Sequence, residues 1–508
     1  MNRALNRPMI TLSIMLATIM QTLDSTIANV ALPHMQGTLS ASQDQIAWVL
    51  TAYIIASAIA TPVTGWLCDR FGQKNIFMAS ITGFTVASAL CGMSNTLAEI
   101  VAARLLQGLF GAALVPLAQV VLMDINPREK QGSAMAVWGM GVMVGPILGP
   151  TLGGWLTDSY DWRWVFFINV PIGIIAFYGM WRYIRPDAGG RHARFDFFGF
   201  ATLSLALGSL QLLMDRGQQN DWFSSTEAWI EAIVAFVAAT YFVAHTAMTP
   251  AKQSFLDYRL LKNQNYVTGL LFIFIVGLVL YATRALIPTM LENLLGYPVA
   301  TTGLVTAPSG IGTMFAMLIA GRIIGKVDLR LTLLAGFLIS AFALWQMAGY
   351  SLDLTEGDII WPGVVQGFGT GLVFVPLSAA TFATLSPEMR AQGTAIYSLV
   401  RNIGSSIGIS LVQTMLTRNT VIAHSSLAER VTAASSAWHN PAVAAAFSRS
   451  PGATALLDGA VTQQAAMIAY IDDFWFMLFL TLLVVPLLLL IRPPRQGTAV
   501  PDAQAVMD

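Results

Sequence analysis

Long apolar runs separated by short polar segments fill almost the whole chain. Each run has about 20 residues or more, the length an α-helix needs to cross a bilayer. We predict fourteen membrane-spanning helices, at residues 9–32, 45–67, 76–95, 97–123, 132–157, 163–183, 197–214, 227–248, 265–290, 300–325, 331–350, 359–384, 391–417 and 471–491. Since several connections have only a few residues, consecutive helices are expected to run antiparallel.

Composition supports an all-α integral membrane protein. Of 508 residues, 55% are hydrophobic and 11% are charged, whereas an average soluble domain has about a quarter charged residues. The formal net charge of zero gives no basic surface for nucleic acid. Cys68 and Cys91 lie near opposite ends of consecutive predicted helices, so we expect neither a disulfide nor a metal site. The first run is too long for a signal-peptide core, and we expect it to be retained.

Lysine and arginine positions predict the orientation, because cytoplasmic loops carry more of them. With fourteen helices, nineteen of the 27 basic residues fall on the side that holds both termini, which is therefore the predicted cytoplasmic side. The other side holds Arg163, Arg216, Arg418, Arg430 and Arg449. A helix added or lost midway would destroy this asymmetry.

Four charged residues are predicted to lie within the membrane: Asp24, Arg104, Arg284 and Arg401. Arg284 lies near the outer end of helix 9, where its side chain can extend to the lipid headgroups. Arg401 lies deeper, on the wall of a cavity in the second half or opposite an acid that the sequence does not identify. Asp215 and Glu292 fall at helix ends.

The two halves of the chain resemble each other. Four matches occur in order: the segments that begin at Gly65, Gln107, Val115 and Asn126 recur at Gly321, Gln366, Val375 and Ser386. The last match includes Gly132 and Gly393, so the separations run from 256 to 261 residues. Matched helices run in the same direction, which indicates a parallel repeat and a carrier that alternates access to a site between its halves. The predicted division is a first six-helix bundle at 1–190, two inserted helices at 191–260, a second bundle at 261–495 and a cytoplasmic tail at 496–508.

One connection is long. Residues 418–470 are rich in Ala, Ser and Thr and poor in charge, and we predict an outward-facing loop. It serves either as a flexible linker or as a docking element or lid over the outer mouth.

Several motifs resemble those of the major facilitator superfamily. The turn Gly65-x-Leu67-x-Asp69-Arg70-x-Gly72-x-Lys74 is similar to its loop signature, and Arg104-x-x-Gln107-Gly108 to its fourth-helix motif. The segment Gly141-x-x-x-Gly145-Pro146-x-x-Gly149-Pro150 resembles the fifth-helix motif of drug:proton antiporters, although Pro150 stands where many of them have glycine. The stretch that begins at Leu23 is similar to the first-helix motif of the fourteen-helix branch, the EmrB/QacA type. The stretches that begin at Trp162 and Asp221 are similar to the EmrB side of this branch.

This resemblance implies a major facilitator fold that exports hydrophobic and amphipathic compounds in exchange for protons. It also implies location in a bacterial inner membrane, a periplasmic adaptor of the membrane-fusion class and an outer-membrane channel as partners, and no cofactor. A dedicated exporter of a fatty acid, lipid or siderophore is the alternative. A passive channel or membrane enzyme is disfavoured, because we find no phosphate-binding loop, zinc-binding helix motif or nucleophile set.

Asp24 and Arg104 are the predicted proton-coupling residues. Counted from the outer ends of helices 1 and 4 at ~1.5 Å per residue, they reach matching depths. Burial disfavours a charged carboxylate and a nearby guanidinium favours it, so a site whose water and arginine contacts change can bind and release a proton. The alternative is a fixed structural ion pair. Arg104 can also bind backbone carbonyls, with Gln107 and Asn29 in the same network. Sodium remains open as the coupling ion.

The turn at 65–74 is predicted to latch the two halves. Gly65 and Gly72 permit close packing and a tight turn, and Asp69 can accept hydrogen bonds from a helix N-terminus of the other half. Arg70 and Lys74 would meet carboxylates or lipid headgroups. The alternative is that the basic residues only mark the inner face.

The glycine stripe in helix 5 predicts close helix packing. Its members recur every fourth residue at Gly141, Gly145, Gly149 and Gly153, while Pro146 and Pro150 remove backbone donors and bend the helix. The stripe either serves packing alone or seals the interface between the halves against proton leak. Candidate residues of the substrate cavity are Gln21, Asn29, Gln107, Gln119, Tyr397, Arg401 and Gln413.

Overall fold

The computed structural model describes residues 6–184, 195–250, 254–324, 326–430 and 453–491. Within these residues, fourteen segments are long and apolar enough to cross a membrane, which confirms the predicted number. A spanning chain must satisfy its backbone hydrogen bonds internally, and apolar helices do so. Several spans are broken into two helices, and the α-helices of at least eight residues are α1 (Arg7–Thr38), α2 (Gln43–Ala60), α3 (Thr64–Phe71), α4 (Gln73–Met93), α5 (Leu97–Gly111), α6 (Leu114–Ile125), α7 (Arg128–Ser159), α9 (Asn169–Tyr183), α10 (Phe197–Arg216), α11 (Thr226–Met248), α12 (Gln264–Thr289), α13 (Val299–Ile323), α14 (Leu329–Met347), α15 (Glu356–Ala383), α16 (Pro387–Arg430) and α18 (Ala453–Leu483).

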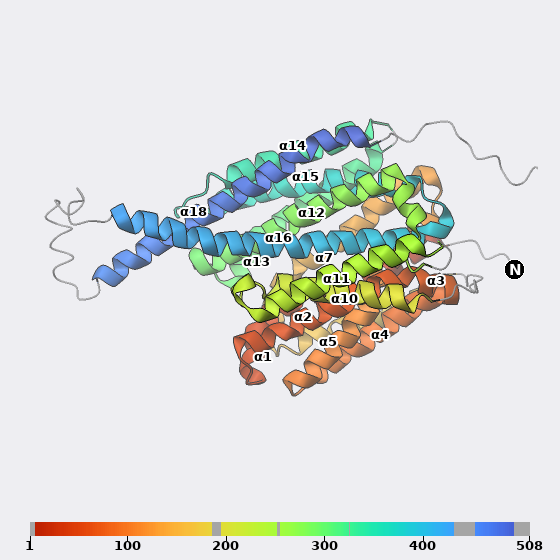
Figure 1. The fold of residues 1–508 in the computed structure, drawn as a ribbon, viewed down its shortest axis with the longest axis horizontal. Coiled ribbons are helices and arrows are strands. Elements are labelled where there is room, and N and C mark those ends of the chain that lie inside the picture. The colour runs from red at the N-terminus through yellow and green to blue at the C-terminus, as the bar shows by residue number, and fades with distance from the viewer. Residues whose placement is uncertain (1–5, 185–194, 251–253, 325, 431–452, 492–508) are drawn as a thin grey trace, which may run out of the picture.

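The two halves use the same helix pairing. In the first half α1 packs on α7 and α9, α2 on α5, and α4 on α5 and α9. In the second half the corresponding pairs are α12 with α16 and α18, α13 with α15, and α14 with α15 and α18. The sequence repeat is therefore a repeat of packing. Figure 1 shows the first half, coloured red to orange, on one side and the second half, green to blue, on the other.

Two contacts between the halves are related by the same repeat. The span made of α2 and α3 meets α16, and α13 meets α7. The inserted helix α10 lies against both α2 and α16, so it covers the first of these seams, and α11 packs on α10 (Figure 1). The sequence indicated an insertion without showing that α10 bridges the halves.

The halves are joined at the predicted cytoplasmic face. The Arg390 guanidinium is 2.8 Å from the Asp124 carboxylate, and the Ser133 hydroxyl donates to the Gly321 carbonyl at 3.2 Å. A methyl group built on Gly65 would lie 2.9 Å from the Cα atom of Gln392, so α3 and α16 touch through backbone. This arrangement closes the end of the space between the halves that is predicted to face the cytoplasm.

The prediction of a loop at 418–470 is wrong for most of this segment. Helix α16 continues to Arg430 and α18 begins at Ala453, and both extend beyond the rest of the bundle at the end opposite the N-terminus (Figure 1). Residues 431–452 lie outside the described part of the chain. The low charge and Ala-rich composition suggested a linker, but alanine is the best helix former.

The glycine stripe of α7 packs on α1, inside the first half. A methyl group on Gly145 would lie 2.5 Å from the carbonyl carbon of Thr22, and one on Gly141 would lie 3.2 Å from Met15. The Thr26 hydroxyl donates to the Gly145 carbonyl at 3.1 Å. The predicted close packing is present, but the hypothesis that this stripe seals the seam between the halves is wrong. Other residues of α7 face α13 there; Gly139, for example, contacts Met317.

Candidate functional site

Asp24 and Arg104 form a buried ion pair at the centre of the first half. Arg104 Nη1 lies 2.7 Å from Asp24 Oδ2, and the two side chains are 1% and 0% exposed. Arg104 Nη1 also donates to Gln107 Oε1 at 2.8 Å, and the Gln107 amide donates to Asp24 Oδ1 at 2.8 Å. The matching depths predicted from the sequence therefore correspond to direct contact.

Two further helices contribute to this pair. Arg104 Nε donates to the Val49 carbonyl of α2 at 2.9 Å, so the predicted bond to a neighbouring backbone exists. Asn169, at the start of α9, donates to Asp24 Oδ1 at 2.8 Å and to Ser88 Oγ at 3.0 Å. We call Asp24, Arg104, Gln107 and Asn169 the Asp24 cluster. A charge pair this deep is stable only when its remaining donors and acceptors are satisfied, and these bonds satisfy them.

Asn29 does not belong to this cluster, contrary to the prediction. It lies on the exposed surface of α1, five residues after Asp24, and a five-residue step turns a helix by about 140°. Asn169 takes the place that was expected for Asn29. The sequence contained a signal for it, since Asn169 belongs to the motif after Trp162, but no charge marked it as a partner.

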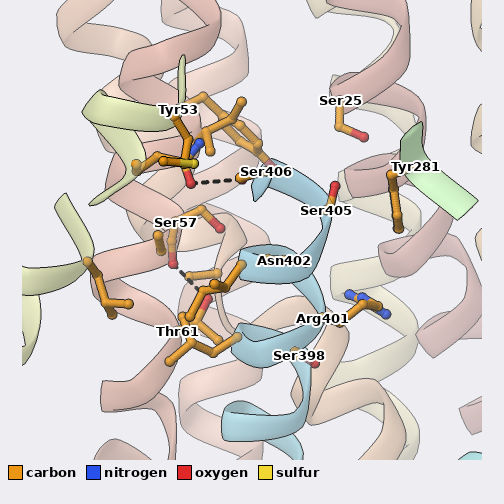
Figure 2. A pocket seen from close by; sticks show the side chains of 18 of the residues that line it. Ser25, Tyr53, Ser57, Thr61, Tyr281, Ser398, Arg401, Asn402, Ser405 and Ser406 are labelled. Atoms are coloured by element: carbon orange, nitrogen blue, oxygen red, sulfur yellow. Dashed lines mark hydrogen bonds between the residues drawn. The ribbon is translucent and has the colours of Figure 1, made fainter. Parts of the chain in front are cut away.

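A cavity of about 300 Å³ lies between the halves. Its wall comes from α1, α2, α6, α10, α12 and α16, and it includes Gln21, Ser25, Tyr53, Gln211, Asp215, Tyr281, Arg401, Asn402 and Gln413. In Figure 2, Arg401 points from α16 to the side that carries Tyr281, and Asn402 points toward Ser57 and Thr61. Polar and apolar side chains are mixed on this wall, a lining that suits small amphipathic molecules.

Three of the predicted cavity residues line this space: Gln21, Arg401 and Gln413. The other four do not. Asn29 is exposed on the surface of the bundle, and Gln107 belongs to the Asp24 cluster. Gln119 is fully buried. Tyr397 is buried against Ser378, and the two hydroxyl oxygens are 3.2 Å apart. These predictions were wrong because the sequence gives depth along an apolar helix but not the direction in which each residue faces.

Arg401, on the cavity wall, and Arg284, on the same helix as the wall residue Tyr281, have no acidic partner among the described residues. Arg401 is 9% exposed, and its Nε makes no hydrogen bond within the described residues. Arg284 points into the bundle, where its guanidinium is 3.2 Å from Met143 Sδ of α7, so the expected extension to the headgroups is wrong. Asp215 of α10 lines the cavity and accepts a hydrogen bond from Thr51 of α2.

The turn at 65–74 lies at the inner end of the seam. Gly72 has φ 84°, a conformation that favours glycine, and Asp69 is one helical turn beyond Gly65, on the short helix that packs against α16. Lys74 Nζ donates to the carbonyls of Trp181 and Ile184 at the end of α9, at 3.1 and 2.5 Å. The carboxylate or lipid partner that we expected for Lys74 stays a prediction. Arg70 lies over the rings of Trp66 and Phe71.

Comparison with known proteins decides the family. The profile of the Major Facilitator Superfamily matches residues 14–409. The chain belongs to this superfamily. It is 35% identical over 490 residues to the fatty acid resistance protein FarB of Neisseria gonorrhoeae, covering 96% of both chains. It is 34% identical over 493 residues to the multidrug export protein EmrB of Escherichia coli K12, covering 95% of both.

Solved structures of the superfamily share the fold. The human organic anion transporter MFSD10 aligns with a TM-score of 0.59 at 14% identity, covering 94% of this chain and 99% of its own. The proton:xylose symporter XylE aligns with a TM-score of 0.59 at 12% identity, covering 94% and 96%. At these identities the likeness concerns architecture alone.

Proposed function

We propose that this protein is a proton-driven exporter of hydrophobic and amphipathic compounds. One observation carries the proposal: a fully buried Asp24–Arg104 pair lies within one half, and the same helix α1 lines a cavity between the halves with Gln21 and Ser25. No ATP-binding motif occurs in the sequence, so the energy must come from an ion gradient. About 2.3 kcal/mol per charge is available for each 100 mV of membrane potential.

The proton cycle follows from the ion pair. With Asp24 ionised, Arg104 and two amide groups hold the carboxylate, as in this structure. A proton that arrives from the outer side neutralises Asp24 and removes the charge attraction to Arg104. The helices that the pair joins, α1 and α5, can then shift relative to each other. Because the inner face is closed here by Arg390–Asp124 and Gly65–Gln392, we assign this conformation to the part of the cycle that releases cargo outward.

The named relatives favour the same activity. FarB is described as a fatty acid resistance protein and EmrB as a multidrug export protein. We propose that the protein resides in a bacterial inner membrane with both termini in the cytoplasm. We also propose that a periplasmic adaptor and an outer-membrane channel continue the export path. The projecting ends of α16 and α18 lie on the side where an adaptor would bind (Figure 1).

A second candidate, a dedicated exporter of an anionic amphiphile such as a fatty acid, is favoured by Arg401. Its buried guanidinium has no acidic partner in the described residues, and a carboxylate is a suitable ligand for it. Replacement by Arg401→Gln should weaken binding of the anionic dye 8-anilinonaphthalene-1-sulfonate about tenfold. Binding of the cation ethidium should remain the same or strengthen. Equal effects on both dyes would remove the argument for an anionic substrate.

Transport in proteoliposomes with an imposed pH gradient tests the function. Protein reconstituted with one orientation should move ethidium or the anionic dye against the proton flow, and reversal of the gradient should reverse the movement. Asp24→Asn should abolish the dependence on the gradient. A sodium gradient at constant pH should have no effect; if it drives transport instead, sodium is the coupling ion and the proton hypothesis is wrong.

A further inference from the structure

The cavity and the Asp24 cluster are adjacent but separate. Helix α1 serves both: Gln21, Thr22 and Ser25 line the cavity, whereas Asp24 faces the interior of the first half. Asp24 is 0% exposed and does not line the cavity. Substrate in the cavity therefore has no direct contact with the carboxylate, so exchange of substrate for a proton requires a residue that contacts both sites.

Tyr53 of α2 is such a residue. Its side chain lines the cavity (Figure 2), where the hydroxyl accepts a hydrogen bond from Gln21 Nε2 at 3.1 Å. The other side of its ring faces the cluster, and the Arg104 guanidinium lies 4.3 Å from the ring centroid. A cation over an aromatic face at this distance is attracted to it, most strongly where water is excluded. Tyr53 is 5% exposed, so its ring forms the partition between the two sites.

Two glycines after Gln107 let α5 approach Tyr53 closely. A methyl group on Gly108 would collide with the Tyr53 carbonyl oxygen, and one on Gly111 would lie 3.3 Å from its hydroxyl. The sequence identified Gln107-Gly108-x-x-Gly111 as part of the repeat, and Gln107-Gly108 as part of the fourth-helix motif, without predicting a contact with Tyr53. In the structure this segment supplies one member of the cluster and the close contact with the tyrosine beside it.

The second half lacks both the charges and the tyrosine. The residues 259 positions after Asp24, Arg104 and Gln107 are Thr283, Gly363 and Gln366. The counterpart of Tyr53 is Ser309, 256 positions later, because Gly367 packs on the Ser309 carbonyl as Gly108 packs on the Tyr53 carbonyl. There the Gln366 amide donates to the Thr283 hydroxyl at 3.0 Å, which makes a neutral counterpart of the cluster. An aromatic partition therefore accompanies the charged cluster and is not a general element of the repeated bundle.

We propose that Tyr53 is the positioning residue that couples occupancy of the cavity to protonation of Asp24. When Asp24 binds a proton, Arg104 loses its charged partner and changes its position against the ring. Tyr53 moves with it and breaks the bond to Gln21, which alters the cavity wall. In the reverse direction, a substrate that displaces Gln21 moves the ring and changes the proton affinity of the cluster. This inference rests on the proposed function.

Few charged or titratable side chains among the described residues face Asp24, so few groups can take part in the coupling. The charged and titratable side chains that face it within the described residues are Arg104 of α5, Tyr53 of α2 and Cys91 of α4. Helix α9 contributes the neutral amide of Asn169, and α7 packs on α1 through glycine backbone. Cys91 lies 3.6 Å from Gln107 Oε1, on the side of the cluster away from the cavity wall.

The pH dependence of substrate affinity tests the coupling, because two linked ligands change each other's affinity by the same factor. Ethidium and 8-anilinonaphthalene-1-sulfonate are the probes, used with purified protein at fixed salt. For the wild type we expect the affinity to change about tenfold or more between about pH 5.5 and about pH 8.5. Tyr53→Phe keeps the ring and removes the bond to Gln21; it should reduce this change to about threefold. Tyr53→Leu should remove the change in affinity with pH. Gln21→Leu should reduce this change as much as Tyr53→Phe does.

A matched variant separates coupling from cavity shape. Tyr281→Phe removes another hydroxyl from the cavity wall. Any change in dye affinity that it causes should be the same at both pH values, so the ratio of the two affinities should equal that of the wild type. If Tyr53→Phe shows the same ratio of affinities as the wild type, the inference is overturned, because this variant preserves the shape of the side chain and the fold. If the wild type itself shows no pH dependence and Asp24→Asn behaves identically, the proposed function fails before Tyr53 is tested.

Discussion

Asp24 Oδ2 and Arg104 Nη1 are 2.7 Å apart, on helices α1 and α5, with both side chains removed from solvent. The desolvation of two charges is compensated only by their attraction and by the bonds from Gln107, Asn169 and the Val49 carbonyl. Loss of either charge therefore changes stability as well as transport, and the two effects have to be separated by experiment.

Replacement of both members of the pair separates them. Asp24→Asn leaves the Arg104 charge buried without its partner, which should lower the free energy of unfolding by about 3–5 kcal/mol. The double variant Asp24→Asn, Arg104→Gln removes both charges and should recover most of this stability. Thermal unfolding in detergent measures it. Proton-coupled transport should stay absent in both variants; its recovery in the double variant would mean that the pair is only structural.

The contact between α7 and α1 should be intolerant of one methyl group. In Gly145→Ala the new carbon would lie 2.5 Å from Thr22 backbone, and overpacking of this kind costs about 1–3 kcal/mol. Gly154→Ala, in the same helix, is the control, since nothing lies within 4 Å of the added carbon. We expect Gly145→Ala to lower the unfolding temperature and the transport rate. We expect Gly154→Ala to match the wild type, and equal behaviour of the two would contradict the packing described.

The inner latch should control the exposure of Cys68, a native thiol in α3 that is 5% exposed. Gly65→Ala pushes α3 away from Gln392, and Asp69→Asn removes a negative charge one helical turn beyond Gly65, on the helix that packs against α16. Both variants should speed up maleimide labelling of Cys68 and slow transport, with little loss of folded protein. Gly37→Ala is the control, because it adds a methyl group in open space. Unchanged labelling in both latch variants would show that the turn only marks topology.

Acidification should weaken the connection before α10. Asp196 is buried, which by itself raises its pKa, but bonds from the Gly199 and Phe255 amides and from His245 outweigh burial and lower the pKa of the carboxyl. Because the pKa of this carboxyl is lower in the folded state, its ionised form stabilises the fold. This stabilisation is complete above the unfolded-state pKa of about 3.9, and it is lost as the pH falls through the folded-state pKa. Asp196→Asn should therefore lower the unfolding temperature at neutral pH and flatten its decline in acid. An unchanged acid profile would contradict this assignment.

The depth of charged residues in the membrane and the pairing of helices in the two halves could be predicted from the sequence, because the rise per residue of a helix is fixed. Counting residues from helix ends placed Asp24 and Arg104 at one level, and they are in contact. The offset between Gln107 and Gln366 predicted two halves, and both halves pair their helices alike. These features depend on position along the helix axis, which an apolar run preserves.

Direction around the axis could not be predicted. Helices that are apolar on all sides give no polar face to orient them, so Asn29 and Gln119 were placed on the cavity wall, where the structure does not put them. The glycine stripe defined one ridge of α7 but not the neighbour it contacts, which is α1. Tyr53 and Asn169 were missed because their roles arise from helices that meet only in three dimensions.

Proton release on substrate binding tests the central claim most directly. Purified protein in weakly buffered detergent, at a series of pH values, is mixed with ethidium or 8-anilinonaphthalene-1-sulfonate in the presence of a pH indicator dye. The account predicts release of protons into solution as the cavity fills, in proportion to bound substrate, and no release from Asp24→Asn. Binding without proton release by the wild type, or equal release by Asp24→Asn, would contradict it.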